Sequence, residues 1–503
     1  MSEAANVARA EGLMAQGRAE EALALTGDLV KGAQPSHMAL AAHAAALKAA
    51  GEVEAALPFN RAATERFAAS PVAWHNLAAT LGDLGRGPEA VAACEEAFRR
   101  GLDAPETWSV YGRALMAAGD HGKAEHAFRQ SLLRAGSDTT VAGELANLIW
   151  MLKGDVGEAE RVLDTAFHAG GAPVPLLLAK ATLFEAAGDE GRAAALLEAA
   201  SAQLPGETAI LLSAAQTALR RERLSDAERY VAMAAAADPQ GRNVAQHQAI
   251  VDLALGRPDQ ALARLKATLE RYPEDQSLWG WAATAARAAG DPLYGRLCDY
   301  DAMVGAYDIA PPAGWTSLDE FLGDLRNSLN SLHAYAQHPA NQSLRHGSQT
   351  LHLLSGSDDP AIQAFFRAID APIRAHMAEI GQGDDPLRRR NTGDYRLAGA
   401  WSVRLRPGGF HKDHFHPEGW LSSAFYVETP DAALDSADRE GWIRFGKPPF
   451  VTNPPMEADH YVRPKPGRLV LFPSYMWHGT VPFTTDEARM TIAFDAAPKS
   501  SPA

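Results

Sequence analysis

Cysteine is almost absent from this chain of 503 residues, which contains only Cys94 and Cys298. The two lie far apart within helical patterns, so we expect small core residues in a reducing compartment, not a disulfide. No apolar run approaches the ~20 residues that a membrane helix needs, and we therefore expect no membrane partner. The first residues lack the basic start and apolar core of a signal peptide, which favours a cytoplasmic protein.

Positive charge is also scarce. The chain has 47 Lys and Arg residues against 62 Asp and Glu residues, for a formal net charge of −15. A nucleic-acid partner requires a basic face that neutralises phosphates, and the sequence shows none. Apolar residues make up 47% of the chain, enough for substantial cores, and its length exceeds what one core organises. Several globular domains are expected.

Glycine and alanine recur with a fixed period through the N-terminal part. The glycine series has a spacing of 34 residues with one slip of a single residue, and its positions are Gly17, Gly51, Gly85, Gly119, Gly154, Gly188, Glu222, Gly256 and Gly290. Alanine follows five residues later, at Ala22, Ala56, Ala90, Ala124, Ala159, Ala193, Ala227 and Ala261. A glycine that ends one helix and a small residue that admits a second helix predict stacked helical hairpins, which form a solenoid with a concave surface.

This pattern resembles the tetratricopeptide repeat, because Trp108 and Tyr111 also repeat the phase of Trp74 and Leu77. About eight repeats fit between residues 7 and 290, and the expected first domain is 1–290. The resemblance implies that the groove binds a protein or peptide partner or that the array forms a homodimer. A purely structural scaffold is the alternative.

A connector and a docking helix are expected over residues 291–337. The pair Pro311 and Pro312 predicts a rigid extended segment, and Ser317 precedes a run with apolar residues at helical spacing. The polar segment 338–350 is expected to be a loop, either beside the active site or on the plain surface. A further helix from Ile362 to Met377 leads into the strands.

Short strands dominate the rest, which we expect to be a third domain over 338–498. The predicted strands span residues 400–405, 420–427, 442–445, 469–472 and 490–494. Short strands between glycines and prolines predict a jelly roll, that is, a double-stranded β-helix with flanking helices. The expected fold class is therefore a multidomain α + β chain, with an all-α repeat solenoid followed by this jelly roll.

Histidines and a carboxylate cluster within six residues of this domain, as is typical of a metal site. They form two overlapping pairs with a spacing of two, His411 with Asp413 and His414 with His416. In a strand the two pairs would point to opposite faces, so both cannot bind one metal.

Together with His478, and with Arg489 eleven residues beyond it, this cluster resembles the bacterial Fe(II)- and 2-oxoglutarate-dependent dioxygenases of the His-x-His-Pro type, over about residues 340–497. The resemblance implies Fe(II), 2-oxoglutarate and O2 as cofactors. It favours His414, His416 and His478 as metal ligands, since His414 lies six residues after Gly408, and leaves His411 and Asp413 as the alternative pair.

The same resemblance assigns Arg489 to the distal carboxylate of 2-oxoglutarate, with Tyr426 and Ser423 as further candidate contacts. It implies an enzyme, a hydroxylase, and the fused repeats favour a protein or peptide substrate. Three alternatives stay open: a non-catalytic repeat scaffold with a vestigial metal-binding barrel, an oxygenase of small molecules, and a cupin-like metalloenzyme that uses no 2-oxoglutarate.

Overall fold

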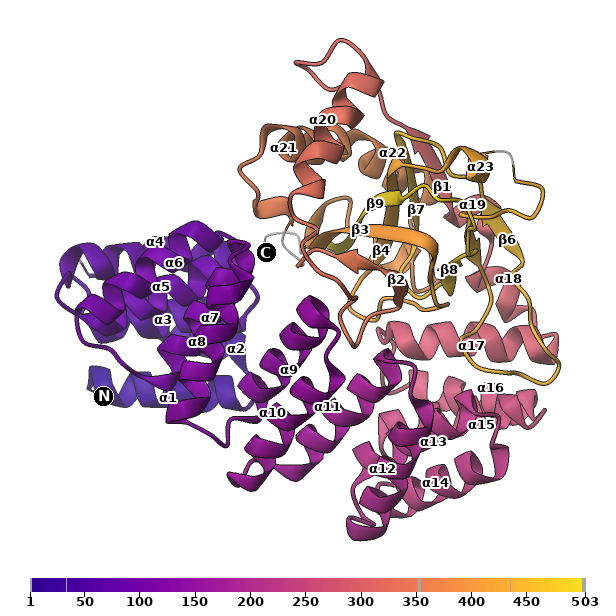
Figure 1. Ribbon diagram of the computed structural model, residues 1–503, viewed down its shortest axis with the longest axis horizontal. Helices are drawn as coiled ribbons and strands as arrows, with labels where there is room; N and C mark the ends of the chain where they lie inside the picture. Colours follow the sequence, from indigo (N-terminus) through magenta and orange to yellow (C-terminus); the bar gives the residue numbers. More distant parts are fainter. Residues whose placement is uncertain (1, 33, 352–353, 435, 500–503) are drawn as a thin grey trace. The chain divides into compact units, whose positions relative to one another are not determined.

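The computed structural model describes residues 2–32, 34–351, 354–434 and 436–499. Contacts divide the chain into two compact units, Met1–Leu145 with His168–Gly171 and Ala146–Phe167 with Ala172–Ala503. The first unit contains helices α1 to α8, and the second contains the strands described below (Figure 1). These contacts do not test the domain boundaries expected at residues 290 and 337, which remain predictions.

Consecutive helices pack against one another from α1 to α8 and again from α11 to α17. Their bounds are α1 Glu3–Ala15, α2 Ala19–Val30, α3 His37–Ala49, α4 Val53–Arg66, α5 Pro71–Asp83, α6 Gly87–Arg99, α7 Pro105–Ala117, α8 His121–Arg134, α9 Thr139–Lys153, α10 Val156–His168, α11 Pro173–Ala186, α12 Glu190–Gln203, α13 Thr208–Arg220, α14 Leu224–Ala237, α15 Arg242–Ala254, α16 Pro258–Leu269 and α17 Gln276–Ala289. None of the described helices is both long enough and apolar enough to cross a membrane.

The predicted repeat is confirmed at both of its periodic positions. Every glycine of the series has a positive φ, and Glu222, which stands in the place of a glycine, also has a φ of 55°. Each alanine of the second series is fully buried, with 0% of its surface exposed. The left-handed residue ends the first helix of each pair, and the alanine admits its neighbour. The N-terminal part is therefore the expected all-α solenoid of tetratricopeptide type.

The C-terminal part is built from two antiparallel sheets. One has the strand order β1-β7-β4-β9-β3-β2 and the other the order β6-β5-β8. The strands are β1 Gly305–Asp308, β2 Leu344–Gln349, β3 Tyr395–His411, β4 Leu421–Glu428, β5 Ile443–Phe445, β6 His460–Val462, β7 Arg468–Pro473, β8 His478–Thr480 and β9 Arg489–Pro498. The expected jelly roll is confirmed, and the five predicted strands correspond to β3, β4, β5, β7 and β9.

Short helices flank these sheets, as expected. They are α18 Leu293–Leu297, α19 Tyr300–Met303, α20 Leu318–Asn330, α21 Pro360–Ala368, α22 Asp370–Ile380 and α23 Asp431–Leu434, with 3-10 turns at Leu354–Gly356 and Arg388–Arg390. Ser317 caps α20 as predicted, since its hydroxyl accepts a hydrogen bond from Glu320 N at 3.1 Å. Phe321 and Leu325 of α20 and Phe365 of α21 enter one core with Phe425 of β4.

Two expectations for the connecting segments need correction, and one strand was not predicted. This strand is β1, which lies directly before the extended segment at Pro311 and whose Tyr307 pairs with Leu469 of β7. The polar segment 338–350 is only partly a loop, because β2 pairs with β3 along most of its second half. The single helix expected from Ile362 to Met377 is two helices, α21 and α22, with a boundary near Ile369.

Helix α17 packs directly against the loop that precedes His478. A side chain at Gly280 would place its Cβ 2.8 Å from the backbone oxygen of Tyr475, so only glycine permits this approach. Trp477 Nε1 donates to Thr284 Oγ1 at 2.8 Å, and both groups are buried. The last repeat helix and the segment 473–478 therefore form one packed layer of the second unit.

We expect Thr284→Val to lower the free energy of unfolding by about 1–3 kcal/mol, because it leaves the buried indole N–H of Trp477 without an acceptor. Thr284→Ser is the matched control and should retain most of the stability. Denaturant unfolding of the full-length protein measures the difference. Equal stability of the Val variant and the wild type would show that the hydrogen bond does not hold this layer together.

Candidate metal site

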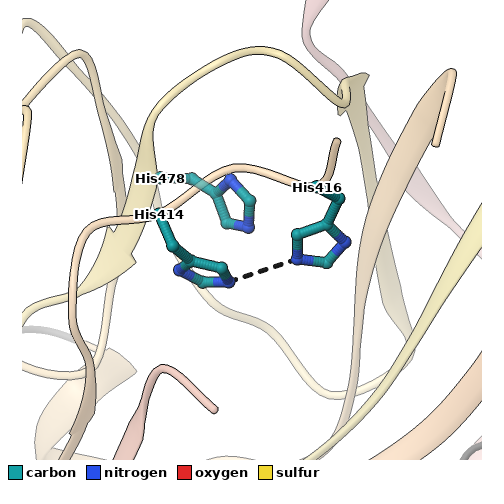
Figure 2. Close-up of side chains that lie close together, drawn as sticks. All are labelled: His414, His416 and His478. Atoms are coloured by element: carbon teal, nitrogen blue, oxygen red, sulfur yellow. Dashed lines mark hydrogen bonds between the residues drawn. The ribbon is translucent and has the colours of Figure 1, made fainter. Parts of the chain in front are cut away.

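Backbone pairing brings three histidines to one point between the two sheets. His414 lies just beyond the end of β3 and forms an isolated β-bridge with His478, in which each backbone N–H donates to the partner's carbonyl oxygen at 2.9 Å. His416 N donates to Ser474 O, also at 2.9 Å. The potential ligand nitrogens of His414, His416 and His478 all lie within 4.8 Å of one another, and the rings face a common point (Figure 2).

The Nδ1 atom of each of these rings has an acceptor. His414 Nδ1 donates to Lys412 O at 2.8 Å, His478 Nδ1 to Met476 O at 3.0 Å, and His416 Nδ1 to Asp495 Oδ1 at 2.6 Å. Carbonyl and carboxylate oxygens carry no proton, so in the neutral ring the proton is at Nδ1 and the lone pair is at Nε2.

Two of these lone pairs face each other closely. His414 Nε2 lies 3.2 Å from His416 Nε2 (Figure 2). Two acceptors at this distance repel each other unless a cation or a proton lies between them. The arrangement therefore fits a metal ion bound by three Nε2 atoms.

Burial keeps the rings of His414 and His478 neutral. Burial and the neighbouring His416 lower the pKa of His414 to about 3. Burial, His414 and His416 likewise lower the pKa of His478 well below its usual range. Neutral imidazole is the form that binds a metal, so these two rings need not lose a proton at neutral pH to act as ligands.

The alternative pair has other partners. Arg444 donates to both oxygens of Asp413, with Nε to Oδ1 at 2.8 Å and Nη2 to Oδ2 at 2.7 Å, and only 8% of Asp413 is exposed. His411 Nδ1 lies 3.1 Å from Ser343 Oγ, and its ring centroid is 5.7 Å from that of His414. The expectation that the two pairs occupy opposite faces is wrong for His411, because β3 ends there and the strand alternation does not continue beyond it.

Asp495 also contacts the histidine cluster, although its sequence position did not single it out as a candidate. Its Oδ1 accepts hydrogen bonds from His416 and, at 2.7 Å, from Ser422 Oγ. Period two along β9 gives the signal that would have found it, because Arg489, Thr491 and Ala493 line the cavity and Asp495 continues the series. The carboxylate therefore contacts one of the three clustered histidines directly and holds its ring in place.

Arg489 is buried in the cavity that the three histidines also line. Only 2% of it is exposed, its Nε has no hydrogen-bond partner, and no ion pair within the described ranges includes it. Burial lowers the pKa of Arg489, and the guanidinium carbon lies 5.0 Å from the ring centroid of Tyr426. A buried cation without a counter-ion is costly, so this position fits an anionic ligand.

Ser423 and Tyr426 lie near Arg489 but make different contacts. Ser423 lines the cavity, and its Oγ donates to Phe494 O at 2.9 Å and accepts from Phe494 N at 2.8 Å. The fully buried Tyr426 ring lies against Arg489, and burial raises the pKa of its phenol. Ser423 thus links β4 to β9 through hydrogen bonds, and the Tyr426 ring packs against the guanidinium of Arg489.

A larger cavity of about 770 Å³ opens onto His414 and His416. Helices α11 and α13 contribute Glu185 and Arg220 to its wall, and Phe415 and Phe450 of the jelly-roll domain contribute apolar surface. All of these residues belong to the second unit. The repeats and the jelly roll therefore share the space in front of the metal site.

Comparison with known proteins gives two family matches. Residues 399–495 match the family described as "Putative 2OG-Fe(II) oxygenase", and residues 75–139 and 248–293 match the tetratricopeptide repeat family. The chain thus combines an oxygenase-family domain with a repeat region. No curated protein matches the chain.

Similar solved structures include repeat proteins of low sequence identity. A tetratricopeptide repeat protein from Parabacteroides merdae is 14% identical, with 46% of this chain and 92% of that chain covered and a TM-score of 0.34. The Cut9-Hcn1 hetero-tetramer of the APC/C is 15% identical, with 56% of this chain and 56% of that chain covered and a TM-score of 0.33. PilF from Pseudomonas aeruginosa is 13% identical, with 42% of this chain and 94% of that chain covered and a TM-score of 0.30.

We expect Asp413→Ala to reduce the free energy of unfolding by about 3–5 kcal/mol, because it leaves the guanidinium of Arg444 buried without its partner. The combined change Asp413→Leu with Arg444→Met removes both charges and should recover most of that loss. Thermal and denaturant unfolding compare the two. A single variant as stable as the wild type would contradict a structural role for this ion pair.

Proposed function

We propose that this protein is an Fe(II)- and 2-oxoglutarate-dependent hydroxylase that acts on a protein or peptide bound by the repeat array. The match of residues 399–495 to an oxygenase family supports the reaction class. One observation carries the proposal: three imidazole Nε2 atoms converge in a cavity that also contains a buried arginine without a counter-ion.

The iron would be held by His414, His416 and His478. Imidazole suits Fe(II), and the hydrogen bond from His416 to Asp495 makes that ring a stronger donor and adds a negative charge nearby. In this proposal Asp413 is not a ligand, since both of its oxygens bind Arg444. His411 lies beside the ligands, where Ser343 Oγ contacts both His411 Nδ1 and, at 3.2 Å, His414 Nε2.

Arg489 would bind the distal carboxylate of 2-oxoglutarate. A guanidinium forms two parallel hydrogen bonds to a carboxylate, and burial strengthens them. Tyr426 fixes the arginine from one side, and Ser423 and Thr491 border the same cavity. Bound iron would supply the chemistry of the family, in which O2 oxidises 2-oxoglutarate to succinate and carbon dioxide and one oxygen atom enters a C–H bond of the substrate.

The surrounding residues exclude water and orient the reactants. Val403 and Ile443 are almost fully buried on opposite sheets and border the cavity that contains Arg489. Trp401 lines both this cavity and the outer one. The substrate would enter through the outer cavity, and tetratricopeptide repeats, whose general role is to bind proteins, form part of its wall.

The ligand assignment predicts a graded loss of metal. His414→Ala, His416→Ala and His478→Ala should each abolish stoichiometric Fe(II) binding, and Asp495→Asn should weaken it by about 10–100-fold because the His416 ring loses its anionic partner. Anaerobic titration calorimetry measures the affinities. The Asp413→Leu, Arg444→Met variant is the control and should bind iron as the wild type does; loss of iron there alone would move the site to His411 and Asp413.

The co-substrate assignment predicts a selective defect in Arg489→Ala. Without the guanidinium, the apparent affinity for 2-oxoglutarate should fall by about 100-fold or more, since a buried ion pair loses one partner, while Fe(II) affinity stays the same. Succinate release and anaerobic binding of 2-oxoglutarate measure the effect, and the exposed Arg296→Gln is the charge-matched control. An unchanged 2-oxoglutarate requirement in Arg489→Ala would exclude the anchoring role of Arg489 and favour an oxygenase without that co-substrate. If the wild-type protein forms no succinate, a binding scaffold is favoured instead.

A further inference from the structure

The hydroxyl of Ser343 lies beside the three clustered histidines and has no role in the metal site as proposed so far. Its Oγ is 3.2 Å from His414 Nε2 and 3.1 Å from His411 Nδ1. The backbone is held in place, since Lys412 N donates to Ser343 O at 3.0 Å. Like His414 and His416, Ser343 borders both the outer cavity of about 770 Å³ and the smaller cavity behind it. The hydroxyl therefore lies where the two cavities meet, next to the proposed ligand nitrogens.

The distance from this oxygen to His414 Nε2 matches the spacing of two ligands on one metal ion. Imidazole nitrogens and oxygen ligands lie about 2.0–2.2 Å from an ion such as Zn²⁺. Two neighbouring ligand atoms of a tetrahedral or octahedral ion are therefore about 3.0–3.5 Å apart. The Nε2 atoms of His414 and His416 are 3.2 Å apart, and Ser343 Oγ is equally far from His414 Nε2. The hydroxyl oxygen thus has the spacing of a further ligand.

A hydroxyl can act as a ligand only if its proton points away from the ion, and His411 provides a second partner for that proton. His414 Nδ1 donates to Lys412 O, so its Nε2 is an acceptor and the Ser343 hydroxyl donates to it. His411 Nδ1 can accept the same proton when its own ring proton is at Nε2. The hydroxyl can therefore turn from His414 to His411 when a cation takes the His414 lone pair, which frees the oxygen lone pairs of Ser343.

The nearby carboxylates are held elsewhere. Both oxygens of Asp413 bind Arg444. Asp495 contacts His416 through Nδ1, and not through the Nε2 atom that faces the other rings. Neither carboxylate therefore adds an oxygen ligand to the three imidazoles, and the Ser343 hydroxyl is the oxygen that has the required spacing.

We propose that Ser343 is a fourth protein ligand of the metal ion and that His411 is the positioning residue that accepts its hydroxyl proton. This inference rests on the metal site of the proposed function and does not depend on turnover. A hydroxyl carries no charge, so it binds a cation less strongly than a carboxylate does, and an anionic ligand can replace it. The proposal also gives a role to His411, which belongs to the histidine cluster of the sequence but is not one of the three proposed histidine ligands.

Absorption spectra of the full-length protein during anaerobic titration with Co(II) test the position of Ser343. A thiolate bound to Co(II) gives an intense charge-transfer band in the near ultraviolet, and thiolates are strong ligands for such ions. Ser343→Cys should therefore show this band at one equivalent of Co(II), whereas the wild type, with Cys94 and Cys298 alone, should not. Ser348→Cys is the matched control and should show no band, because Ser348 Oγ lies 2.9 Å from His333 Nδ1 and borders neither cavity.

The same titration measures what the native hydroxyl contributes. Ser343→Ala should lower the Co(II) affinity by about tenfold and change the visible bands of bound Co(II), because one protein ligand is lost. His411→Phe should produce the same two changes although Ser343 is still present. His411→Asn should remain close to the wild type, since its amide oxygen can still accept the hydroxyl proton. Thermal unfolding of each variant without metal shows that the fold is retained.

Each other result has a definite meaning. Co(II) binding by Ser343→Cys without the charge-transfer band would overturn the proposal. An equal or higher Co(II) affinity of Ser343→Ala would also overturn it, since the hydroxyl would then only compete with the ion for His414. A wild-type spectrum in His411→Phe would exclude the positioning role of His411. If the wild type binds no Co(II), the metal site and this inference are both refuted, whereas tight binding without these effects of Ser343 refutes only the inference.

Discussion

Three imidazole rings can share a cation only if none of them carries a proton at Nε2, and this requirement governs the architecture around the site. The protons are held at Nδ1 by three acceptors from separate segments: Lys412 O, Met476 O and Asp495 Oδ1. The backbone bridge between His414 and His478 then sets the separation of two rings. The geometry of this candidate metal site therefore depends on the register of two loops and on one carboxylate of β9, not on the histidines alone.

Two segments beside these histidines rest on helices of the repeat array. The segment 473–478 packs on α17 through Gly280 and Thr284. The segment before β2 is tied to α9, where Trp150 Nε1 donates to His338 O at 2.8 Å and Asn147 Oδ1 accepts from Ala340 N at 2.9 Å. That segment ends at Ser343, which contacts the His414 ring. Repeat helices of the second unit thus position both of these segments. The proposed catalytic domain is therefore packed against the repeats and not merely linked to them.

Periodicity decided what could be predicted from sequence. Glycine and alanine at a 34-residue spacing predicted the solenoid, and short apolar or alternating runs predicted β3, β4, β5, β7 and β9, while β2 lies in a segment that was predicted to be a loop. Strands β1, β6 and β8 have only three or four residues each, too few for an alternation to stand out, whereas β5 was predicted because Trp442 extends its alternation to four residues. Asp495 was missed because its partner His416 is 79 residues away and only the fold brings them together. His411 was misplaced because the strand stops there. The ligand roles and the Arg489 anchor remain predictions, since sequence and geometry place atoms together without showing what binds them.

Helix α17 belongs to two hydrophobic cores at once. Leu278 and Trp281 enter the core of the preceding repeats, while Ala283 enters the core of the jelly roll. A solenoid normally needs a polar capping helix at its end, and without one its terminal repeat frays first because it has a neighbour on one side only. Here the jelly-roll domain is that cap. Opening of the last repeat would have to break both cores together, so local unfolding at this end is coupled to global unfolding of the oxygenase-family domain.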